Sequence, residues 1–122
     1  MIELKHGDLL KAPVEALVNT VNTEGVMGKG IALQFKKAFP GNYDAYRIAC
    51  ESGEVQPGKV FVYRLHKLTG PKYILNFPAK RHWRERARLD DIATGLNDLV
   101  NQMENLKIQP WQFPRWVVVM EA

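Results

Sequence analysis

Apolar positions change period several times along the chain, from every second residue to every third or fourth. Runs that alternate, or that are apolar throughout, are typical of strands and occur at residues 2–5, 14–18, 59–65 and 72–77. Apolar residues at three- and four-residue steps are typical of amphipathic helices and predict helices at residues 31–39, 43–50 and 89–103. Because helices interleave with strands, the sequence predicts an α/β sheet, in which ligands gather beyond the carboxyl ends of strands.

The longest predicted helix carries a continuous apolar stripe. Its members recur at helical steps and are Leu89, Ile92, Leu96, Leu99, Val100 and Met103. A stripe of this kind is typical of a long helix with one apolar face.

A polar and glycine-rich stretch separates the 14–18 strand from the first helix. Asn19 and Asn22 follow the strand, and glycine fills three of the six positions from 25 to 30. Glycine lets the backbone approach a ligand closely, and the N–H groups at a helix start favour phosphate. We expect a diphosphate-containing ligand to lie on Gly28, Lys29, Gly30 and Ile31. Glycine turns and loop asparagines are also common without a ligand, and this plainer reading stays open.

Size, charge and cysteine content narrow the class of protein. The chain has 122 residues, which suits one domain, and a net charge of +4, which is compatible with a polyanionic partner without requiring one. The single cysteine, Cys50, cannot form an internal disulfide, so we expect a reducing, cytoplasmic environment and a helix core position for this residue. The three histidines and Cys50 show no metal-ligand spacing, no apolar run is long enough to cross a membrane, and nothing in the motifs requires a cofactor. The strand-like start at residues 1–5 leads us to expect no signal peptide.

Three motifs in the first third of the chain resemble a known family. They are residues 7–9 (Gly-Asp-Leu), residues 14–22 and residues 27–32 (Met-Gly-Lys-Gly-Ile-Ala), and in this order they resemble the macrodomain, an ADP-ribose-binding α/β module. The block at residues 76–84 resembles the branch that holds the DarG-type DNA ADP-ribosyl glycohydrolase antitoxins. The resemblance implies a mixed sheet with helices on both faces.

The family resemblance also implies a function. Members of that branch remove ADP-ribose from thymidine in single-stranded DNA and counter a DarT toxin, which makes ADP-ribosylated single-stranded DNA and a DarT-like toxin the expected partners. Two alternatives stay open. One is a non-catalytic ADP-ribose reader, and the other is a hydrolase of ADP-ribose 1″-phosphate or O-acetyl-ADP-ribose.

The resemblance assigns roles to individual residues. Asp8 is expected to accept from the adenine amine, with the Leu9 N–H beside it, although aspartate also favours turns for its own reasons. Asn19 and Asn22 are expected to hydrogen-bond ribose hydroxyls. Lys80 is expected to act at the anomeric carbon of the distal ribose, as a nucleophile or in ring opening, with Asn22 as the second catalytic residue. Without the family, Lys80 would be read as a solvated surface lysine.

The segment from residue 80 to residue 88 is strongly basic. It holds five cations and one tryptophan in nine positions, a pattern that suits a phosphate backbone with one stacked base. We expect Arg81, Trp83 and Arg84 to form a track for single-stranded DNA. The plainer alternative is a solvated helix entry with one packed tryptophan.

The end of the chain departs from the family pattern. A macrodomain continues with a buried strand and a second glycine loop, whereas residues 109–122 hold two tryptophans and two prolines and make a poor buried parallel strand. We therefore expect an incomplete macrodomain at residues 1–108, truncated at its C-terminal side, and an atypical tail at residues 109–122.

The genetic code suggests an origin for this tail. Read two bases later, the codons of residues 109–122 permit Ala-Met-Ala-Ile-Pro-Pro-Leu-Gly-Cys-Gly-Asn-Gly-Gly, an apolar strand that runs into a glycine loop. Our hypothesis is a shifted reading frame that begins near residues 107–109. The alternative is a divergent edge strand at residues 117–120.

Overall fold

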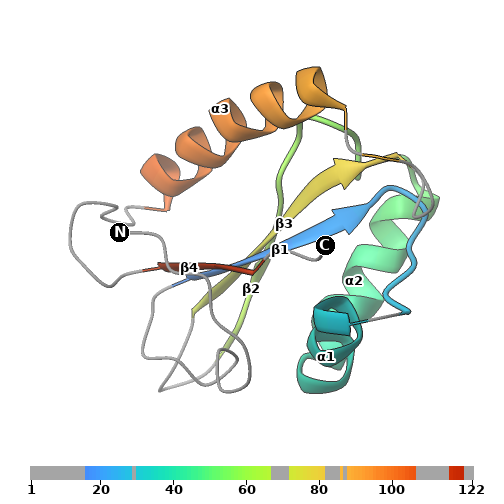
Figure 1. The fold of residues 1–122 in the computed structure, drawn as a ribbon. Helices are drawn as coiled ribbons and strands as arrows, with labels where there is room; N and C mark the ends of the chain where they lie inside the picture. The colour runs from blue at the N-terminus through green and yellow to red at the C-terminus, as the bar shows by residue number, and fades with distance from the viewer. Residues whose placement is uncertain are drawn as a thin grey trace.

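The computed structural model describes residues 16–28, 30–66, 72–81, 86, 88–106 and 116–119, of which residues 30–32 and 116–119 are described by their backbone. Strands and helices interleave along the chain (Figure 1). In chain order the elements are β1 (Ala16–Asn22), α1 (Gly30–Ala38), α2 (Pro40–Glu51), β2 (Phe61–Arg64), β3 (Tyr73–Lys80), α3 (Leu89–Asn105) and β4 (Trp116–Val119). The predicted strand at residues 2–5 lies outside the described residues.

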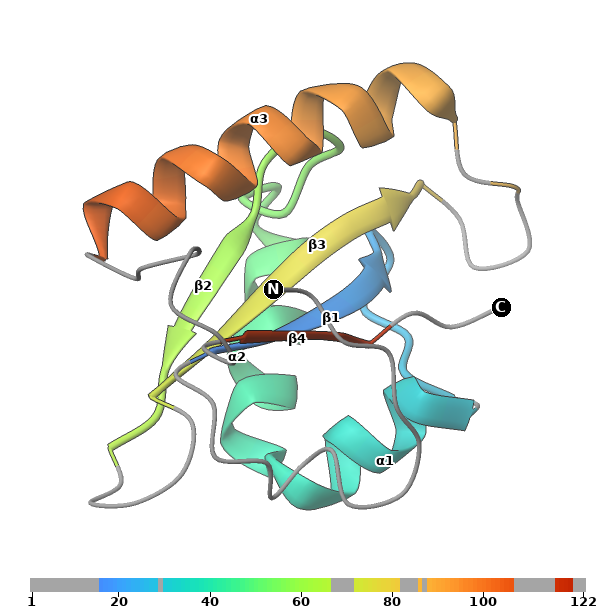
Figure 2. The same ribbon diagram turned by 60° about the vertical axis from the view of Figure 1, so that its left-hand side comes forward.

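The four described strands form one mixed sheet in the order β2-β3-β1-β4. β1 runs parallel to both β3 and β4, whereas β2 is antiparallel to β3. α3 covers one face of the sheet, and α1 and α2 lie on the other face (Figures 1 and 2). The predicted mixed α/β sheet with helices on both faces is therefore confirmed.

Each face of the sheet has its own apolar cluster, because β1 is buried on both sides and alternate residues point to opposite faces. Ala16 and Val18 of β1 join Leu99 and Met103 of α3 on one face. Val21 joins a cluster on the other face whose further members are Met27, Tyr46, Ala49 and Val55. The central strand is thus fixed by helices from both sides.

The pairing between β1 and β3 changes register near its carboxyl end. Val21 pairs with Pro78, and the next pair is Asn22 with Lys80, so Ala79 is an extra residue in β3. An extra residue of this kind is a β-bulge. Proline, which has no N–H to donate to the ladder, is tolerated at such irregularities.

Both paired strands are longer than the sequence pattern predicts. The expected ends at residues 18 and 77 are wrong, because β1 continues to Asn22 and β3 to Lys80. The polar side chains at these positions resemble a loop, but their backbones continue the parallel ladder. As a result Asn19 and Asn22 lie within a strand, and Lys80 is the last residue of a strand.

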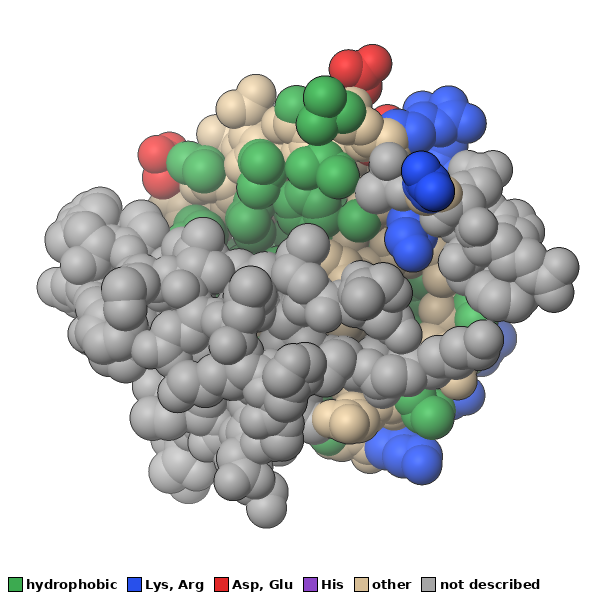
Figure 3. All heavy atoms as spheres, viewed as in Figure 1, with side chains coloured by type: hydrophobic (Ala, Val, Ile, Leu, Met, Phe, Trp, Pro, Cys, Tyr) green, Lys and Arg blue, Asp and Glu red, His purple; other side chains and the backbone are tan. Residues whose placement is uncertain are grey.

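The buried face of α3 differs from the predicted apolar stripe. The helix buries residues at four-residue steps, which are Asp91, Gly95, Leu99 and Met103. Leu89, Leu96 and Val100 are 80%, 51% and 54% exposed, and apolar side chains are visible on the surface over α3 in Figure 3. The rotation follows from contact with the sheet, because a Cβ on Gly95 would lie 2.7 Å from Cζ of Phe77. The helix therefore approaches the sheet along its glycine side.

The tail contributes one strand to the described structure. β4 pairs in parallel with the first half of β1 and forms the edge of the described sheet. Residues 116–119 thus form a strand, which is compatible with either origin of the tail, and Met120 lies outside the described residues.

Candidate functional site

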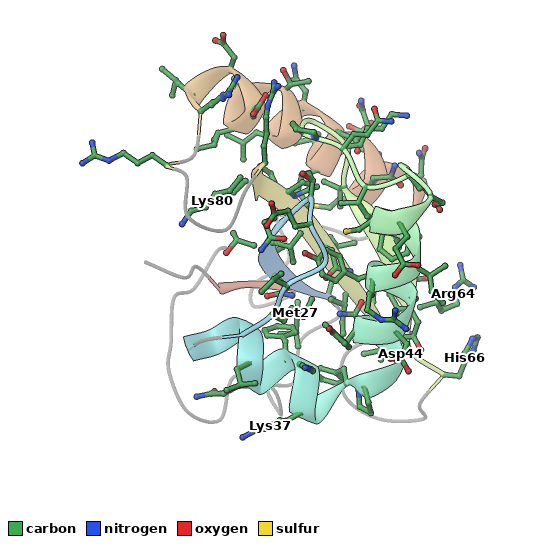
Figure 4. All side chains as sticks on the ribbon, turned by 90° about the vertical axis from the view of Figure 1, so that its right-hand side faces the viewer. Met27, Lys37, Asp44, Arg64, His66 and Lys80 are labelled. Atoms are coloured by element: carbon green, nitrogen blue, oxygen red, sulfur yellow. The ribbon has the colours of Figure 1, made fainter. Side chains whose placement is uncertain are left out.

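The carboxyl ends of β1 and β3 bring the two predicted catalytic residues together. Asn22 and Lys80 are direct partners across the parallel ladder, immediately after the bulge at Ala79. Asn22 is buried, whereas Lys80 is half-buried. In Figure 4 the Lys80 side chain points away from the sheet, while Met27 points inward between the sheet and α1. The pair is therefore a buried amide beside an accessible amine, at the edge where α/β sheets bind ligands.

The side chain of Asn22 shapes the turn that follows β1. Its Oδ1 accepts from the backbone N–H of Glu24 at 2.9 Å and of Val26 at 3.3 Å, and its Nδ2 donates to the carbonyl of Val26 at 3.0 Å. Asparagine favours such contacts because its amide mimics a stretch of backbone. Asn22 thus holds the course of the chain that leads to the glycine loop.

Tyr46 of α2 forms hydrogen bonds with the same residue, Asn22. Its hydroxyl donates to the Asn22 backbone carbonyl at 2.7 Å and lies 3.0 Å from Asn22 Oδ1, and its side chain is fully buried. Burial raises the pKa of Tyr46 well above its usual range, and the nearby Cys50 thiol adds to the rise. The hydroxyl is therefore protonated and available as a donor at neutral pH.

Cys50 lies one helical turn after Tyr46. The prediction that it lies in a helix is confirmed, but it is half-buried and therefore not a fully buried core residue. Burial raises the pKa of its thiol. A protonated thiol is a poor nucleophile, and Cys50 packs against the apolar cluster that includes Tyr46 and Met27.

The glycine loop takes its left-handed backbone at Gly25, with φ of 89°. Gly25 also packs on α2, since a Cβ there would lie 3.6 Å from Cγ of Arg47. A Cβ on Gly28 would meet Val26 Cγ1 at 3.7 Å. The predicted phosphate-binding glycines Gly28 and Gly30 flank the start of α1, and Ile31 lies in its first turn.

Asn19, predicted to bind ribose, is part of a buried network of three asparagines. Its Nδ2 donates to Asn76 Oδ1 at 3.3 Å, and it is 1% exposed. Asn76 donates in turn to Asn42 Oδ1 at 2.8 Å. Asn19 is therefore buried within the sheet and bonded to Asn76, and a contact of Asn19 with ribose stays a prediction. The sequence pattern did not single out Asn42 or Asn76, although an asparagine inside the apolar run of β3 indicates a buried polar contact.

Arg81, predicted to follow a DNA strand, is held within the domain. Its Nε and Nη2 donate to the two carboxylate oxygens of Asp91 at 3.2 and 3.3 Å. Its backbone carbonyl accepts from Thr23 Oγ1 at 2.7 Å. The guanidinium is therefore committed to an ion pair, with half of the side chain exposed.

Several predicted site residues lie outside the described part of the chain, namely Asp8, Leu9, Lys29, Trp83 and Arg84. Within the part that is described, no group of three or more potential metal-binding side chains occurs. No helix in that same part is long and apolar enough to cross a membrane.

Comparisons with known proteins agree with this architecture. The family model described as the Macro domain matches residues 18–116. A DNA ADP-ribosyl glycohydrolase of Thermus aquaticus is 55% identical over 114 residues, which are 93% of this chain and 32% of that protein. The solved macrodomain of Mycobacterium tuberculosis DarG matches with a TM-score of 0.86 and 40% identity, covering 100% of this chain and 99% of that one. Thermosipho africanus DarTG in complex with ADP-ribose matches with a TM-score of 0.80 and 25% identity, covering 96% of this chain and 41% of that one.

This chain spans about a third of the length of the curated relatives it matches. The match to the solved DarG macrodomain covers 99% of that chain. The chain belongs to the macro domain family, on the branch of the DarG macrodomains.

Proposed function

We propose that this domain binds ADP-ribose and removes it by hydrolysis from a modified target, with thymidine-linked ADP-ribose on single-stranded DNA as the favoured substrate. The observation that carries the proposal is the pairing of Asn22 with Lys80 at the carboxyl ends of β1 and β3. Two relatives support it, since one is named a DNA ADP-ribosyl glycohydrolase and the other was solved with ADP-ribose.

In this proposal the diphosphate lies against the start of α1. The backbone N–H groups of Gly28, Lys29, Gly30 and Ile31 donate to it, helped by the positive end of the helix dipole. Asp8 and the Leu9 N–H recognise adenine. The turn held by Asn22 sets the path of the backbone toward these donors.

The chemical step belongs to Lys80. Its Nζ attacks the anomeric carbon of the distal ribose, and the bond to the target breaks with its electron pair and a proton going to the leaving group. Water then hydrolyses the lysine adduct and restores the amine. Asn22 takes part by holding the turn beside the sugar, because its carbonyl oxygen already accepts backbone N–H groups.

The target strand runs along the basic segment after β3. Trp83 stacks on a base and Arg84 contacts phosphate. Arg81 contributes through the exposed half of its side chain, because its guanidinium is paired with Asp91.

The experiment is release of free ADP-ribose from a single-stranded oligonucleotide that carries ADP-ribosylated thymidine. Lys80→Ala is expected to reduce the rate at least about a hundredfold, in the range that removal of a reacting group causes. Lys72→Ala is the matched control, an exposed lysine immediately before the first residue of the same strand, and is expected to react at the wild-type rate.

The competing functions give different results in the same assay. A non-catalytic reader binds ADP-ribose with no turnover, and Lys80→Ala leaves its affinity unchanged. A hydrolase of ADP-ribose 1″-phosphate or O-acetyl-ADP-ribose turns over those compounds faster than the DNA adduct. Either outcome would refute the proposed substrate.

Further proposals concern the partner, the compartment and the two parts of the chain. We propose a DarT-like toxin as the partner whose modification the domain reverses, and the cytoplasm as its compartment. We also propose that residues 1–108 are an incomplete macrodomain and that the atypical tail at residues 109–122 comes from a shifted reading frame. Sequencing the encoding DNA tests the last idea, which fails if the alternate frame does not stay open.

A further inference from the structure

We propose that Thr23 and Asp91 are positioning residues for Lys80, which act by holding the next residue, Arg81, from two sides. We call Thr23, Arg81 and Asp91 the Arg81 clasp. The inference rests on the proposed function, because it assigns Lys80 the chemical step. It adds two residues that lie outside the sequence motifs of the site.

The first arm of the clasp joins the ends of neighbouring strands. Thr23 follows the last residue of β1, and Arg81 follows the last residue of β3. The Thr23 hydroxyl donates to the Arg81 carbonyl at 2.7 Å, the usual length of a hydrogen bond between oxygen atoms. This side-chain contact continues the link between the two strands one residue past the last ladder pair.

The second arm joins the same residue to α3. Both carboxylate oxygens of Asp91 accept from the Arg81 guanidinium, at 3.2 and 3.3 Å. A two-point contact of this kind fixes orientation as well as distance. Asp91 is 9% exposed and lies in the first turn of α3, where the helix dipole favours a negative charge. The buried carboxylate would be left without its charged partner if Arg81 moved away, so the pairing holds Arg81 in place.

Lys80 needs such an anchor because of what precedes it. Ala79, the residue before it, is the extra residue of the bulge, and a bulged residue is left without its regular ladder partner. On the other side the Arg81 clasp fixes the chain through a backbone atom and a side chain. The position of the Lys80 amine over the sugar therefore depends on the clasp, and an error of about 1 Å at a reacting group can lower a rate about a hundredfold.

The test compares Thr23→Val, Asp91→Asn and a matched control. Thr23→Val keeps the shape of the side chain and removes the hydroxyl. Thr94→Val makes the same change at a hydroxyl that also donates to a backbone carbonyl, that of Asp90 at 2.9 Å, within α3. Each protein is assayed for kcat and KM on the ADP-ribosylated oligonucleotide, for Kd of ADP-ribose by calorimetry, and for Tm.

The clasp predicts a loss in the chemical step with binding retained. Thr23→Val and Asp91→Asn are expected to lower kcat about ten- to a hundredfold, with Kd of ADP-ribose within twofold of the wild type. Thr23→Ser restores the hydroxyl and is expected to restore kcat. Thr94→Val is expected to match the wild type in kcat and Kd.

The outcomes separate this inference from the proposed function. Wild-type kcat in both clasp variants, together with an inactive Lys80→Ala, overturns the clasp and leaves the function standing. An active Lys80→Ala refutes the function itself. A parallel fall of kcat, ADP-ribose affinity and Tm shows general structural damage and also overturns the clasp. If Asp91→Asn does not fold, the kcat values of Thr23→Val and Thr23→Ser test the clasp instead. These substitutions are expected to fold, because Thr23 is half-buried and lies in a turn.

Discussion

Removing the hydroxyl of Tyr46 tests the support beneath the site. Tyr46→Phe keeps the buried ring and deletes the donor to the Asn22 carbonyl and to Asn22 Oδ1, at 2.7 and 3.0 Å. Asn22 Oδ1 keeps two backbone N–H donors, from Glu24 and Val26. The backbone carbonyl of Asn22 loses the donor that Tyr46 supplies in a buried setting.

The expected cost at neutral pH follows from these contacts. A hydrogen bond between neutral groups contributes about 0.5–1.5 kcal/mol net, and stranding a buried acceptor costs about 1–3 kcal/mol. We expect the free energy of unfolding to fall by about 1–3 kcal/mol, because Tyr46 is 0% exposed and water cannot replace the donor.

The pH dependence gives this prediction a second signature. Burial raises the pKa of Tyr46 above its usual value of 10.0, so the unfolded chain loses this proton at a lower pH than the folded chain does. Stability from this group is therefore fully present below pH 10 and is lost as the pH rises toward the folded pKa. The advantage of the wild type over Tyr46→Phe should shrink by about 1.4 kcal/mol for each pH unit above that point.

Urea denaturation followed by circular dichroism at pH 7, 10 and 11 measures both effects. Tyr43→Phe is the control, because Tyr43 lies one turn earlier on α2, with its ring 6.5 Å from that of Tyr46. The reasoning is refuted if Tyr46→Phe is as stable as the wild type at pH 7. It is also refuted if the difference between the two proteins stays constant from pH 10 to pH 11.

Three further changes test the packing around the sheet and the loop. Gly95→Ala would place a Cβ 2.7 Å from Phe77 Cζ. The cost of overpacking, about 1–3 kcal/mol, should outweigh the gain in helix propensity, about 1 kcal/mol, so the urea midpoint should fall, and a rise would contradict the close approach. Asp98→Ala removes the carboxylate oxygen Oδ2 that lies 2.6 Å from the backbone nitrogen of the buried Val60. The free energy of unfolding should fall by about 1–3 kcal/mol, and Asp98→Asn should lose less in the same denaturation assay. The new Cβ of Gly25→Ala meets ordinary contacts, but the alanine must adopt φ of 89°, which costs about 1–2 kcal/mol of strain. We expect calorimetry to show ADP-ribose binding weakened about tenfold, and an unchanged affinity would show that the ligand does not depend on this turn.

The helix and strand order was predictable from the sequence, whereas the rotation of α3 was not. The three- and four-residue spacing shows that this helix is amphipathic, but the buried side is chosen by its partners. Gly95 admits the Phe77 ring, and Asp91 pairs with Arg81 at the start of the helix. These are contacts between distant parts of the chain, and no local pattern contains them. Leu96 therefore lies on the surface although its hydropathy is that of a core residue.

The candidate site was likewise predictable in part, because some of its contacts join distant parts of the chain. The resemblance to the family implied catalytic roles for Asn22 and Lys80, but their pairing across the ladder comes from the structure. The role of the Asn22 amide in the turn depends on where Val26 and Tyr46 lie in three dimensions. Asn19 was expected at the ligand because of its place after an apolar run. Its burial follows from a strand that continues past that run and from Asn76 directly across the ladder.

The bulge at Ala79 means that the site is specified by chain length as well as by side chains. With an unbroken ladder, Val21 opposite Pro78 would be followed by Asn22 opposite Ala79, and the bulge instead puts Lys80 in that place. Deletion of a single residue here would change the partner of Asn22 while leaving every reactive group in the sequence. Comparisons between relatives that score substitutions and treat gaps as neutral would overlook such a change, so the count of residues between Pro78 and Arg81 is itself a marker of whether the pairing of Asn22 with Lys80 is retained.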